Sequence, residues 1–435
     1  MTTPTMRRTF PVIARTPAIA VGFFVALFFL AWFRLSGAER GTMWAEDASI
    51  FSARALDPSQ LTLGIFTPYA GYTHAVPQAI ASFVWWAIPT SDVAVAFTAA
   101  SCAVAAGVGV LIYFLTGHWR LHPAARVALG SVSVLAPGLA YEVLGNLANI
   151  HWLLLWLTPF LFLARPRSWV SSVLLGIVAF FTVATEIQSA VFSPLLIWRL
   201  RDRRRWPIIV GAAAGAAFQA SAYLQSTGGR GAGHPSLSTL VDGYFLQAPL
   251  VALTGTGQGA SALVGYSGWD IAYLSIVPFV IGAVWFILNR RRPAALVVVA
   301  LFGASVAIWA AGFWLNFFPQ FDFSTMDPGT LKGGVPLLRY SIVPIMLLWA
   351  LIALGAGSAR DRRLGAKGIA TLLLMASVFA FSYRVDDHSA REMGPTWSPE
   401  IGRAEVQCDI GTTEDVVIPV APATWSVEVP CDEVE

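Results

Sequence analysis

Long apolar segments recur along nearly the whole chain and are separated by short polar loops. A transmembrane helix requires roughly 20 consecutive apolar residues. We place such helices at about 18–35, 92–116, 127–142, 150–164, 169–185, 187–200, 207–224, 269–289, 294–315, 340–358 and 368–384. The sequence therefore predicts an all-α polytopic membrane protein with about eleven transmembrane helices.

Basic residues fall almost entirely in every second loop. When the first segment is read from inside to outside, the internal loops hold 19 of the 28 basic residues and only Asp202 and Asp361 of the 25 acidic ones. These basic residues are Arg7, Arg8, Arg15, Arg120, Arg126, Arg165, Arg167, Arg199, Arg201, Arg203, Arg204, Arg205, Arg290, Arg291, Arg292, Arg360, Arg362, Arg363 and Lys367. Because basic loops remain cytoplasmic, we expect a cytoplasmic N-terminus, an extracytoplasmic C-terminus and an outer side rich in acids.

The composition excludes a soluble globular protein. Charged residues make up 12% of the chain and hydrophobic residues 56%, whereas about 25% of an average chain is charged. Apart from the loop arginines, no basic stripe is interleaved with aromatic residues, so we expect no nucleic-acid partner. Arginine exceeds lysine, and Ala and Gly are frequent. This bias is typical of a high-GC bacterium, so we expect a multi-pass protein of the bacterial plasma membrane.

The first outer loop (36–91) is expected to contain two interfacial helices. Val76–Pro89 is apolar but only about 14 residues long, the length of an interfacial segment. Counting it as a crossing would place every later arginine cluster outside. We therefore expect it to lie on the outer surface, with Trp85 and Trp86 at headgroup level.

The second interfacial helix is predicted by an apolar stripe earlier in the same loop. Residues at i, i+4, i+7 and i+11 form this stripe: Trp44, Ala48, Phe51 and Ala55. Asp47 and Arg54 share another side of the same helix, so the Asp47 carboxylate is expected to face away from lipid.

The end of the chain differs in composition from the rest. We expect a transmembrane domain at 1–384 and a small extracytoplasmic segment at 385–435. Three short, partly alternating runs at 404–410, 415–420 and 424–431 predict a small β-structure. Cys408 and Cys431 lie on the outer side, where a disulfide persists, so we expect them to pair, whereas Cys102 lies in an apolar run and is expected in the core.

The first candidate for chemistry is the pair Glu46 and Asp47 in the first outer loop. A carboxylate just above the membrane can act as general base toward a sugar hydroxyl. Adjacent acids point to different sides of a helix, so one of them is expected to face the site, and Asp47 is preferred. The alternative is that one acid caps the helix N-terminus.

A very short outer turn carries the second group, composed of Glu142, Asn146, Asn149 and His151. These side chains can read sugar hydroxyls through hydrogen bonds. Asn is also common at such turns, so the amides can instead cap the two helix ends.

Glu186 forms the third candidate and follows an apolar run almost without a loop. An acid so close to hydrocarbon indicates function, although an interhelical hydrogen bond would also explain it.

Lys332, Arg339 and Tyr340 form the fourth group, where the chain re-enters the membrane. Arginine at an outer helix end needs a negative partner, and a guanidinium binds phosphate through paired hydrogen bonds. We therefore expect a lipid phosphate at Arg339, with Lys332 second. The alternative is that these side chains snorkel to the outer headgroups.

Tyr72 and His74 precede the interfacial segment and are candidates to line a glycan groove. No His/Cys cluster has zinc spacing, and no nucleotide-binding motif occurs. No cofactor is required by the sequence. A divalent cation, Mg²⁺ or Mn²⁺, held by Glu46, Asp47 and Glu142 is compatible with it, because hard cations take carboxylate oxygens.

Taken together, these features resemble the GT-C superfamily of integral-membrane glycosyltransferases, particularly actinobacterial members that act on cell-envelope polysaccharides. The Glu46-Asp47-Ala48 sequence is similar to the Asp-Asp or Asp-Glu motif that those enzymes carry in the same loop. The likeness covers the layout of the first half of the chain well and the second half loosely. The turn at 145–149 lacks the acid pair of the metal-dependent oligosaccharyltransferases, so the resemblance does not imply a metal.

The resemblance implies a GT-C-like fold and a polyprenyl-phosphate-linked sugar as donor. It also implies an envelope glycan or glycolipid as acceptor and transfer with inversion on the extracytoplasmic side. By the same resemblance, Asp47 would be the general base and Arg339 a contact to the phosphate.

Two other functions remain open at this point. A polysaccharide polymerase or ligase would share the membrane and the lipid phosphate, but the outer arginines are sparse for such an enzyme. A lipid transporter or flippase would place ionisable residues near the bilayer midplane, and the apolar segments here are almost free of them.

The expected topology is testable by reporter fusions. A reporter inserted at Gly71–His74 is expected to show an extracytoplasmic location, and one inserted at 199–205 a cytoplasmic location, because only the latter loop is rich in arginine. Fusions that place Gly71–His74 in the cytosol would overturn this arrangement.

Overall fold

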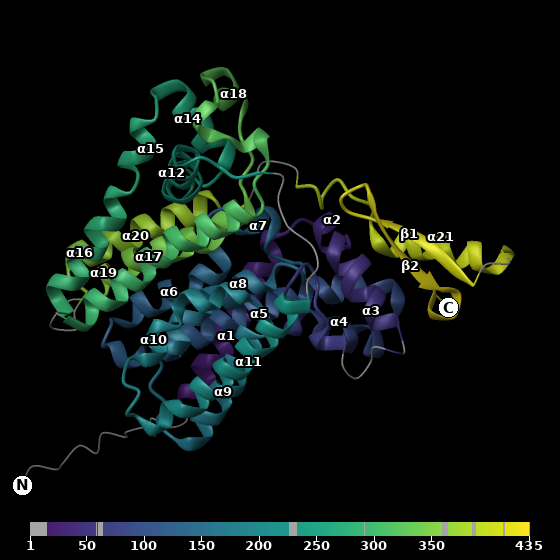
Figure 1. The fold of residues 1–435 in the computed structure, drawn as a ribbon, viewed down its shortest axis with the longest axis horizontal. Helices are drawn as coiled ribbons and strands as arrows, with labels where there is room; N and C mark the ends of the chain where they lie inside the picture. Colours follow the sequence, from purple (N-terminus) through teal and green to yellow (C-terminus); the bar gives the residue numbers. More distant parts are fainter. Residues whose placement is uncertain are drawn as a thin grey trace, which may run out of the picture.

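The chain folds into a bundle of helices with a small two-stranded sheet at one end (Figure 1). The computed structural model describes residues 15–57, 59, 64–225, 233–290, 292–358, 364–384, 389–411 and 414–434. The first half contains α1 (Arg15–Arg34), α2 (Gly37–Arg40), η2 (Asp47–Ser52), α3 (Ala53–Leu56), η4 (Gly64–Phe66), α4 (Ala75–Ala87), η5 (Thr90–Asp92), α5 (Val93–Leu115), η6 (Thr116–Trp119), α6 (Pro123–Leu135), α7 (Leu139–Glu142), α8 (Ile150–Phe162), α9 (Trp169–Val183), η7 (Ile187–Phe192), α10 (Pro194–Ile197), η8 (Arg203–Arg205) and α11 (Trp206–Gln225).

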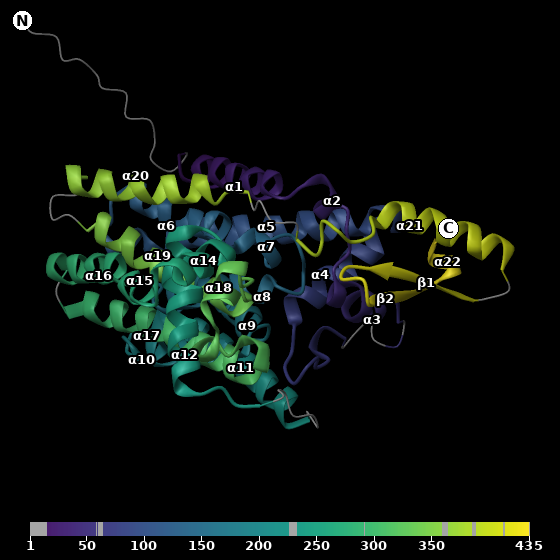
Figure 2. The ribbon, with the colours of Figure 1, turned by 90° about the horizontal axis from the view of Figure 1, so that it is seen from above.

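The second half begins with a cluster of shorter helices and ends in the sheet. Its elements are α12 (Leu237–Phe245), η9 (Leu246–Leu250), α13 (Val251–Thr254), α14 (Gly257–Ser267), α15 (Asp270–Leu274), α16 (Val277–Arg290), α17 (Arg292–Leu315), η10 (Pro319–Phe321), η11 (Phe323–Thr325), α18 (Pro328–Gly333), η12 (Arg339–Ser341), α19 (Ile342–Ala356), α20 (Ala366–Phe381), α21 (Trp397–Ile410), β1 (Asp415–Val420), β2 (Trp425–Pro430) and α22 (Cys431–Val434). Helices α1, α16, α17 and α20 run along the length of the molecule (Figure 2).

The protein is a multi-pass membrane protein. In the described residues, 7 helical stretches are long and apolar enough to cross a membrane: Pro17–Arg34, Thr90–Trp119, Pro123–Glu142, Arg203–Gln225, Asp270–Arg290, Ala294–Leu315 and Arg339–Ala356. The apolar helices α8, α9 and α20 are shorter, at 13, 15 and 16 residues. The expected total of about eleven crossings is not confirmed, since the segment expected at 187–200 consists of the 3-10 turn η7 and the four-residue helix α10.

Two helices form the centre of the bundle. All residues of α8 and α19 are buried, and neighbouring helices pack around them. Apolar packing between membrane helices depends on close approach and not on exclusion of water. The α9–α11 pair shows this approach, because a Cβ atom on Gly211 would lie 2.0 Å from the carbonyl oxygen of Gly176.

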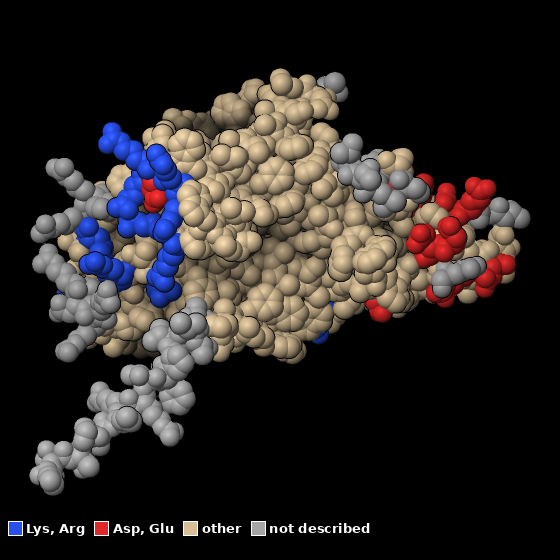
Figure 3. Space-filling model, turned by 90° about the horizontal axis from the view of Figure 1, so that it is seen from below, with Lys and Arg blue, Asp and Glu red and all other residues tan. Residues whose placement is uncertain are grey.

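Charged side chains gather at opposite ends of the molecule (Figure 3). Hydrogen bonds join the basic loops to one another: Arg290 donates to the carbonyl of Arg120 at 2.8 Å, and Arg204 to that of Arg167 at 2.7 Å. Acidic side chains gather at the other end, over β1, β2 and α21 (Figure 3). The expected sorting of charge is therefore present in the described residues, which exclude Arg7, Arg8, Arg291, 360–363 and the side chains of Arg15 and Arg292.

The first outer loop forms short helices, in part as expected. Trp44, Ala48 and Phe51 are buried, so the predicted apolar stripe packs inward. Trp86 is 81% exposed, consistent with an interfacial position, whereas Trp85 is buried against the ring of Trp397, with centroids 6.4 Å apart. The expectation that Trp85 reaches the headgroups is therefore corrected.

Arg54 also departs from the expected arrangement on this helix. Its guanidinium donates to the carbonyls of Thr67 and Pro68, at 2.9 and 2.8 Å, while the Asp47 carboxylate binds backbone N–H groups elsewhere. The helix expected here is present over 45–56, but Asp47–Ser52 adopts a π-helical conformation before α3, which changes the direction of the side chains.

The C-terminal segment contains two of the three predicted strands. β1 and β2 pair antiparallel, with Val416 opposite Val429 and Ile418 opposite Val427. The run at 404–410 is helical instead and belongs to α21. Its buried residues recur with helical spacing once the preceding residues are included: Trp397, Ile401 and Ala404.

The expected disulfide between Cys408 and Cys431 is present and joins α21 to the start of α22, directly after β2. Cys102 is a buried free thiol, as expected. The expected domain boundary at 384/385 lies outside the described residues.

The C-terminal segment packs on the first outer loop. The backbone N–H of Trp397 donates to the carbonyl of Gly41 at 2.8 Å, and its indole N–H to the carbonyl of Thr90 at 2.7 Å. The N–H of Ala421 donates to the carbonyl of Met43 at 3.1 Å, just before Glu46. The segment thus supports the loop that carries the paired acids.

We expect Trp397→Ala to loosen this attachment. The side chain is 1% exposed and fills the contact with Trp85, so its loss is expected to cost about 3–5 kcal/mol. The denaturant midpoint and the proteolysis rate of the C-terminal segment in detergent would measure the change. Val406→Ala, on the exposed side of the same helix, serves as the control, and equal effects of both changes would contradict the proposed anchor.

Candidate functional site

A cleft of about 320 Å³ lies at the end of the bundle away from the basic loops. Its walls come from five segments that are far apart in the sequence: the first outer loop, the start of α8, the turn before η7, the end of α17 and the start of η12. Most of the candidate residues from the sequence line this single cavity.

The candidates that line the cleft are Glu46, Tyr72, His74, Asn149, His151, Glu186, Arg339 and Tyr340. Four other candidates do not line it: Asp47, Glu142, Asn146 and Lys332. Asp47, Glu142 and Asn146 contact residues of the wall from behind, whereas Lys332 lies on α18 with its ammonium 4.8 Å from the ring centroid of Tyr266. The expected part of Lys332 in phosphate binding is therefore not supported by its position.

Of the two adjacent acids, Glu46 lines the cleft and Asp47 does not. The Asp47 side chain is buried, with only 2% of the residue exposed. Its two carboxylate oxygens accept the backbone N–H groups of Leu147 and Ala148, at 2.9 and 2.7 Å. The preference for Asp47 as the acid that faces substrate is revised for this reason, because both oxygens are already engaged inside the protein.

The turn that donates hydrogen bonds to Asp47 requires a glycine. Gly145 has φ of +88°, and a Cβ atom there would lie 2.4 Å from a side-chain carbon of Leu35 and 2.7 Å from the guanidinium of Arg391. Glycine alone adopts this conformation without steric cost. The turn thereby presents the N–H groups of Leu147 and Ala148 to the Asp47 carboxylate.

A buried arginine from the C-terminal segment supports the same turn. Arg391 donates to the carbonyl of Leu144 at 3.2 Å and to the Thr98 hydroxyl at 3.1 Å. Burial raises the pKa of Asp47 to about 7, while the two N–H groups and the charge of Arg391 act in the opposite direction. Asp47 therefore has a structural role, because it links the first outer loop to the turn before α8.

Arg339 has the acidic partner that its position in the sequence required. One guanidinium nitrogen lies 3.0 Å from a carboxylate oxygen of Glu142. The Arg339 side chain remains 35% exposed and lines the cleft. Its planar guanidinium carries five N–H donors, so donors remain for an anion in the cleft.

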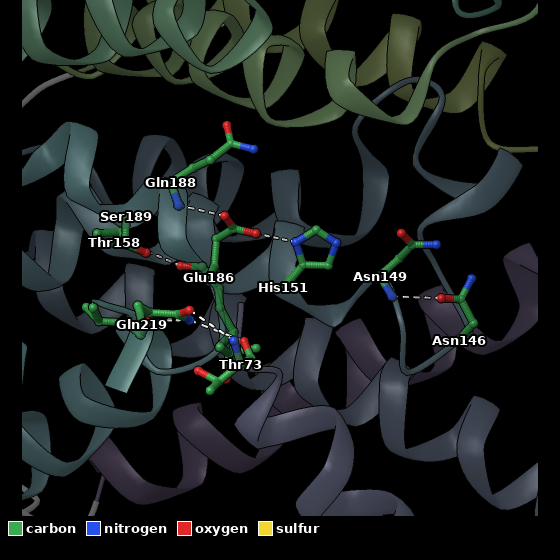
Figure 4. A network of polar contacts seen from close by, with 12 residues as sticks. Thr73, Asn146, Asn149, His151, Thr158, Glu186, Gln188, Ser189 and Gln219 are labelled. Carbon is green, nitrogen blue, oxygen red and sulfur yellow. Dashed lines mark hydrogen bonds and ion pairs between the residues drawn. The ribbon is translucent and has the colours of Figure 1, made fainter. Parts of the chain in front are cut away.

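The two amides of the short turn satisfy backbone groups. The side-chain amide of Asn149 donates to the carbonyl of Glu142 at 3.1 Å, and the Asn146 amide donates to the same carbonyl. Asn146 accepts the backbone N–H of Asn149 at 2.9 Å (Figure 4). Both amides therefore cap the end of α7, whereas the start of α8 has no side-chain cap, so the capping alternative holds for one of the two helix ends. Asn149 additionally lines the cleft.

His151 and Glu186 form a buried ion pair or hydrogen bond on one wall of the cleft (Figure 4). The Nδ1 atom of His151 contacts one carboxylate oxygen of Glu186, and the other oxygen accepts the backbone N–H of Gln188 at 2.7 Å. The sequence indicated each residue separately but gave no sign of the pair, because 35 residues separate them.

Aromatic rings surround this pair. The His151 ring lies 4.3 Å from that of Trp152 and 6.3 Å from that of Tyr72, measured between centroids. Tyr340 packs edge-on against Trp152 at 6.2 Å. The cleft thus combines flat apolar surfaces with hydrogen-bonding groups, as binding sites for sugars and other polar ligands do.

One residue of the cleft wall and one residue that supports it were not anticipated from the sequence. Asn316 follows the end of α17 and lines the cleft, with its amide donating to the carbonyl of Gly312 at 2.8 Å. The sequence did offer a signal for Asn316, because it is a polar residue directly after a predicted transmembrane helix. Arg391 carried no local signal, because its partners lie about 250 to 350 positions away in the chain.

The carboxylates of the site do not assemble a metal centre. Among the described residues, no group of three or more His, Cys, Asp or Glu side chains is placed to hold a metal ion. This includes the set of Glu46, Asp47 and Glu142 that the sequence allowed.

Comparison with known proteins places the chain in no family. No family model matches it, and no curated protein matches it. A functional assignment therefore depends on the chemistry of the cleft.

Replacing Asp47 or Glu46 by its amide tests whether the two acids have different roles. Asp47→Asn offers only one good acceptor to two N–H groups, so it is expected to destabilise the fold by about 1–3 kcal/mol. Glu46→Gln is expected to change stability by less than about 0.5 kcal/mol. Unfolding in detergent would measure both, and equal losses of stability would contradict this distinction.

Proposed function

We propose that the protein is a membrane glycosyltransferase that moves a sugar from a polyprenyl-phosphate carrier to a hydroxyl of an envelope glycan or glycolipid. Transfer would occur on the extracytoplasmic side of a bacterial plasma membrane, with a GT-C-like mechanism and no required cofactor. One observation carries the proposal: a single cleft, remote from the arginine-rich loops, unites the Glu46 carboxylate, the Arg339 guanidinium and an aromatic wall.

Glu46 is the proposed general base. Its carboxylate takes the proton of the acceptor hydroxyl while that oxygen attacks the anomeric carbon of the donor. The bond from this carbon to the phosphate oxygen breaks, and the electron pair leaves with the polyprenyl phosphate. Attack from the side opposite the phosphate inverts the configuration at the anomeric carbon.

Arg339 is the proposed binding group for the leaving phosphate. A guanidinium recognises phosphate through two parallel hydrogen bonds, and fixed donors stabilise charge that develops during a reaction. The pairing with Glu142 holds Arg339 at the cleft before substrate binds. Because the leaving phosphate is a stable anion, the mechanism needs no acid to protonate it.

The membrane setting suits a lipid-linked donor. Two long apolar stretches reach the site, since Ala294–Leu315 ends and Arg339–Ala356 begins at the cleft wall. A polyprenyl tail can therefore remain in the bilayer while its phosphate reaches Arg339. The concentration of polar groups in one terminal cleft favours chemistry over passage of a substrate through the bundle, as a flippase would require.

Glu46→Gln is the direct test of the base. In detergent or membranes supplied with a polyprenyl-phosphate-linked sugar, we expect kcat to fall about 10²- to 10⁴-fold, with little change in KM. Glu405→Gln, an exposed acid on α21, is the matched control and is expected to retain wild-type activity. Full activity of Glu46→Gln would remove this assignment, and absence of transfer by the wild type from any such donor would remove the proposed function.

A further inference from the structure

The buried pair of His151 and Glu186 has no part in the proposed proton transfer or phosphate binding. His151 lies in the first turn of α8, and Glu186 directly precedes η7. Only 6% of His151 and 1% of Glu186 are exposed. Both nevertheless line the cleft, and burying two ionisable groups is costly unless each is paired.

The contacts of Glu186 determine which nitrogen of His151 carries a proton. One carboxylate oxygen is occupied by the N–H of Gln188, and the other faces Nδ1 of the imidazole. With Glu186 ionised, both of its oxygens accept hydrogen bonds, so Nδ1 is the protonated nitrogen. In the neutral ring, Nε2 is then a hydrogen-bond acceptor.

The acceptor nitrogen is directed away from Glu186. Figure 4 shows the second ring nitrogen on the side of the imidazole opposite the carboxylate. Nε2 makes no hydrogen bond with any part of the chain that the structure describes. A hydroxyl in the cleft would supply the missing donor.

The surroundings of His151 favour a neutral sugar ring. Trp152 and Tyr72 provide flat surfaces beside the imidazole. The acids of the wall are Glu46 and Glu186, and the guanidinium of Arg339 is assigned to the phosphate of the donor. A sugar with its own carboxylate would meet repulsion here, since like charges close together are unfavourable.

We propose that Nε2 of His151, positioned by Glu186, accepts a hydrogen bond from one hydroxyl of a neutral donor sugar and thereby selects the donor. This inference rests on the proposed function, because it assigns the sugar-binding part of the same cleft. A site built to bind a hydroxyl rejects the analogue that lacks it, since the buried partner is left unsatisfied.

A series of donor analogues tests the inference. The probes are polyprenyl-phosphate-linked neutral hexoses and pentoses, one uronic acid, and the monodeoxy and deoxyfluoro analogues of the best neutral donor. For the wild type we expect no uronic acid transfer and one deoxy position at which kcat/KM falls roughly 10- to 100-fold, mainly through KM.

His151→Phe removes the acceptor and keeps a ring of similar shape. In this variant, the penalty at the sensitive deoxy position is expected to shrink to less than about threefold, while the other positions are unchanged, as a double-mutant cycle requires. His118→Gln, near the basic end, is the control and is expected to keep the wild-type profile.

Glu186→Gln provides a second test that does not leave a buried charge unpaired. The N–H of Gln188 still requires an oxygen, so the new amide nitrogen faces Nδ1 of His151 and shifts the ring proton to Nε2. A fluorine accepts a hydrogen bond but does not donate one. We therefore expect the wild type to have a low kcat/KM with the deoxyfluoro donor. In Glu186→Gln, kcat/KM with the deoxyfluoro donor is expected to exceed that with the deoxy donor.

The outcomes separate this inference from the proposed function. If the wild type transfers no donor, the proposed function fails and the inference falls with it. If transfer occurs but the deoxy and deoxyfluoro profiles of both variants match the wild type, the inference alone is overturned. If His151→Phe does not fold, the fluorine response of Glu186→Gln decides.

Discussion

The Asp47 carboxylate is the contact on which the geometry of the cleft depends. It accepts hydrogen bonds from two backbone N–H groups of the turn before α8. These bonds hold the first outer loop against the start of that helix. Glu46 and His151, on either side of this contact, are thereby placed on walls of one cavity. Arg391 binds the same turn from the C-terminal segment, which explains why a peripheral segment matters for a site that it does not line.

Much of the architecture follows from the sequence because a bilayer imposes simple rules. Arginine-rich loops identified one end of the molecule, and the apolar runs identified nearly all long helices. Candidate residues such as Glu186 and Arg339 were found because polar groups near hydrocarbon are expensive. The sequence could not show which of Glu46 and Asp47 lines the cleft. Their orientation depends on a π-helical turn and on N–H groups about 100 positions away.

The errors arose where local patterns conflict with distant packing. The run at 404–410 alternates like a strand, yet α21 packs a stripe that starts earlier, at Trp397. Trp85 resembles an interfacial anchor but is covered by that same residue. The segment at 187–200 is apolar enough to suggest a crossing, but η7 begins directly after Glu186, the acid that contacts His151. In each case, a partner remote in the chain decides the conformation.

The unequal lengths of the helices have a consequence for how a lipid carrier meets the protein. Helix α8, with 13 residues, spans only about 20 Å, whereas α17, with 24 residues, spans about 36 Å. The hydrocarbon layer is about 30 Å thick, so α8 is shorter than this layer and α17 is longer. The start of α8 and the end of α17 both line the cleft, so the proposed lipid-linked donor would meet the ends of two helices of unequal length.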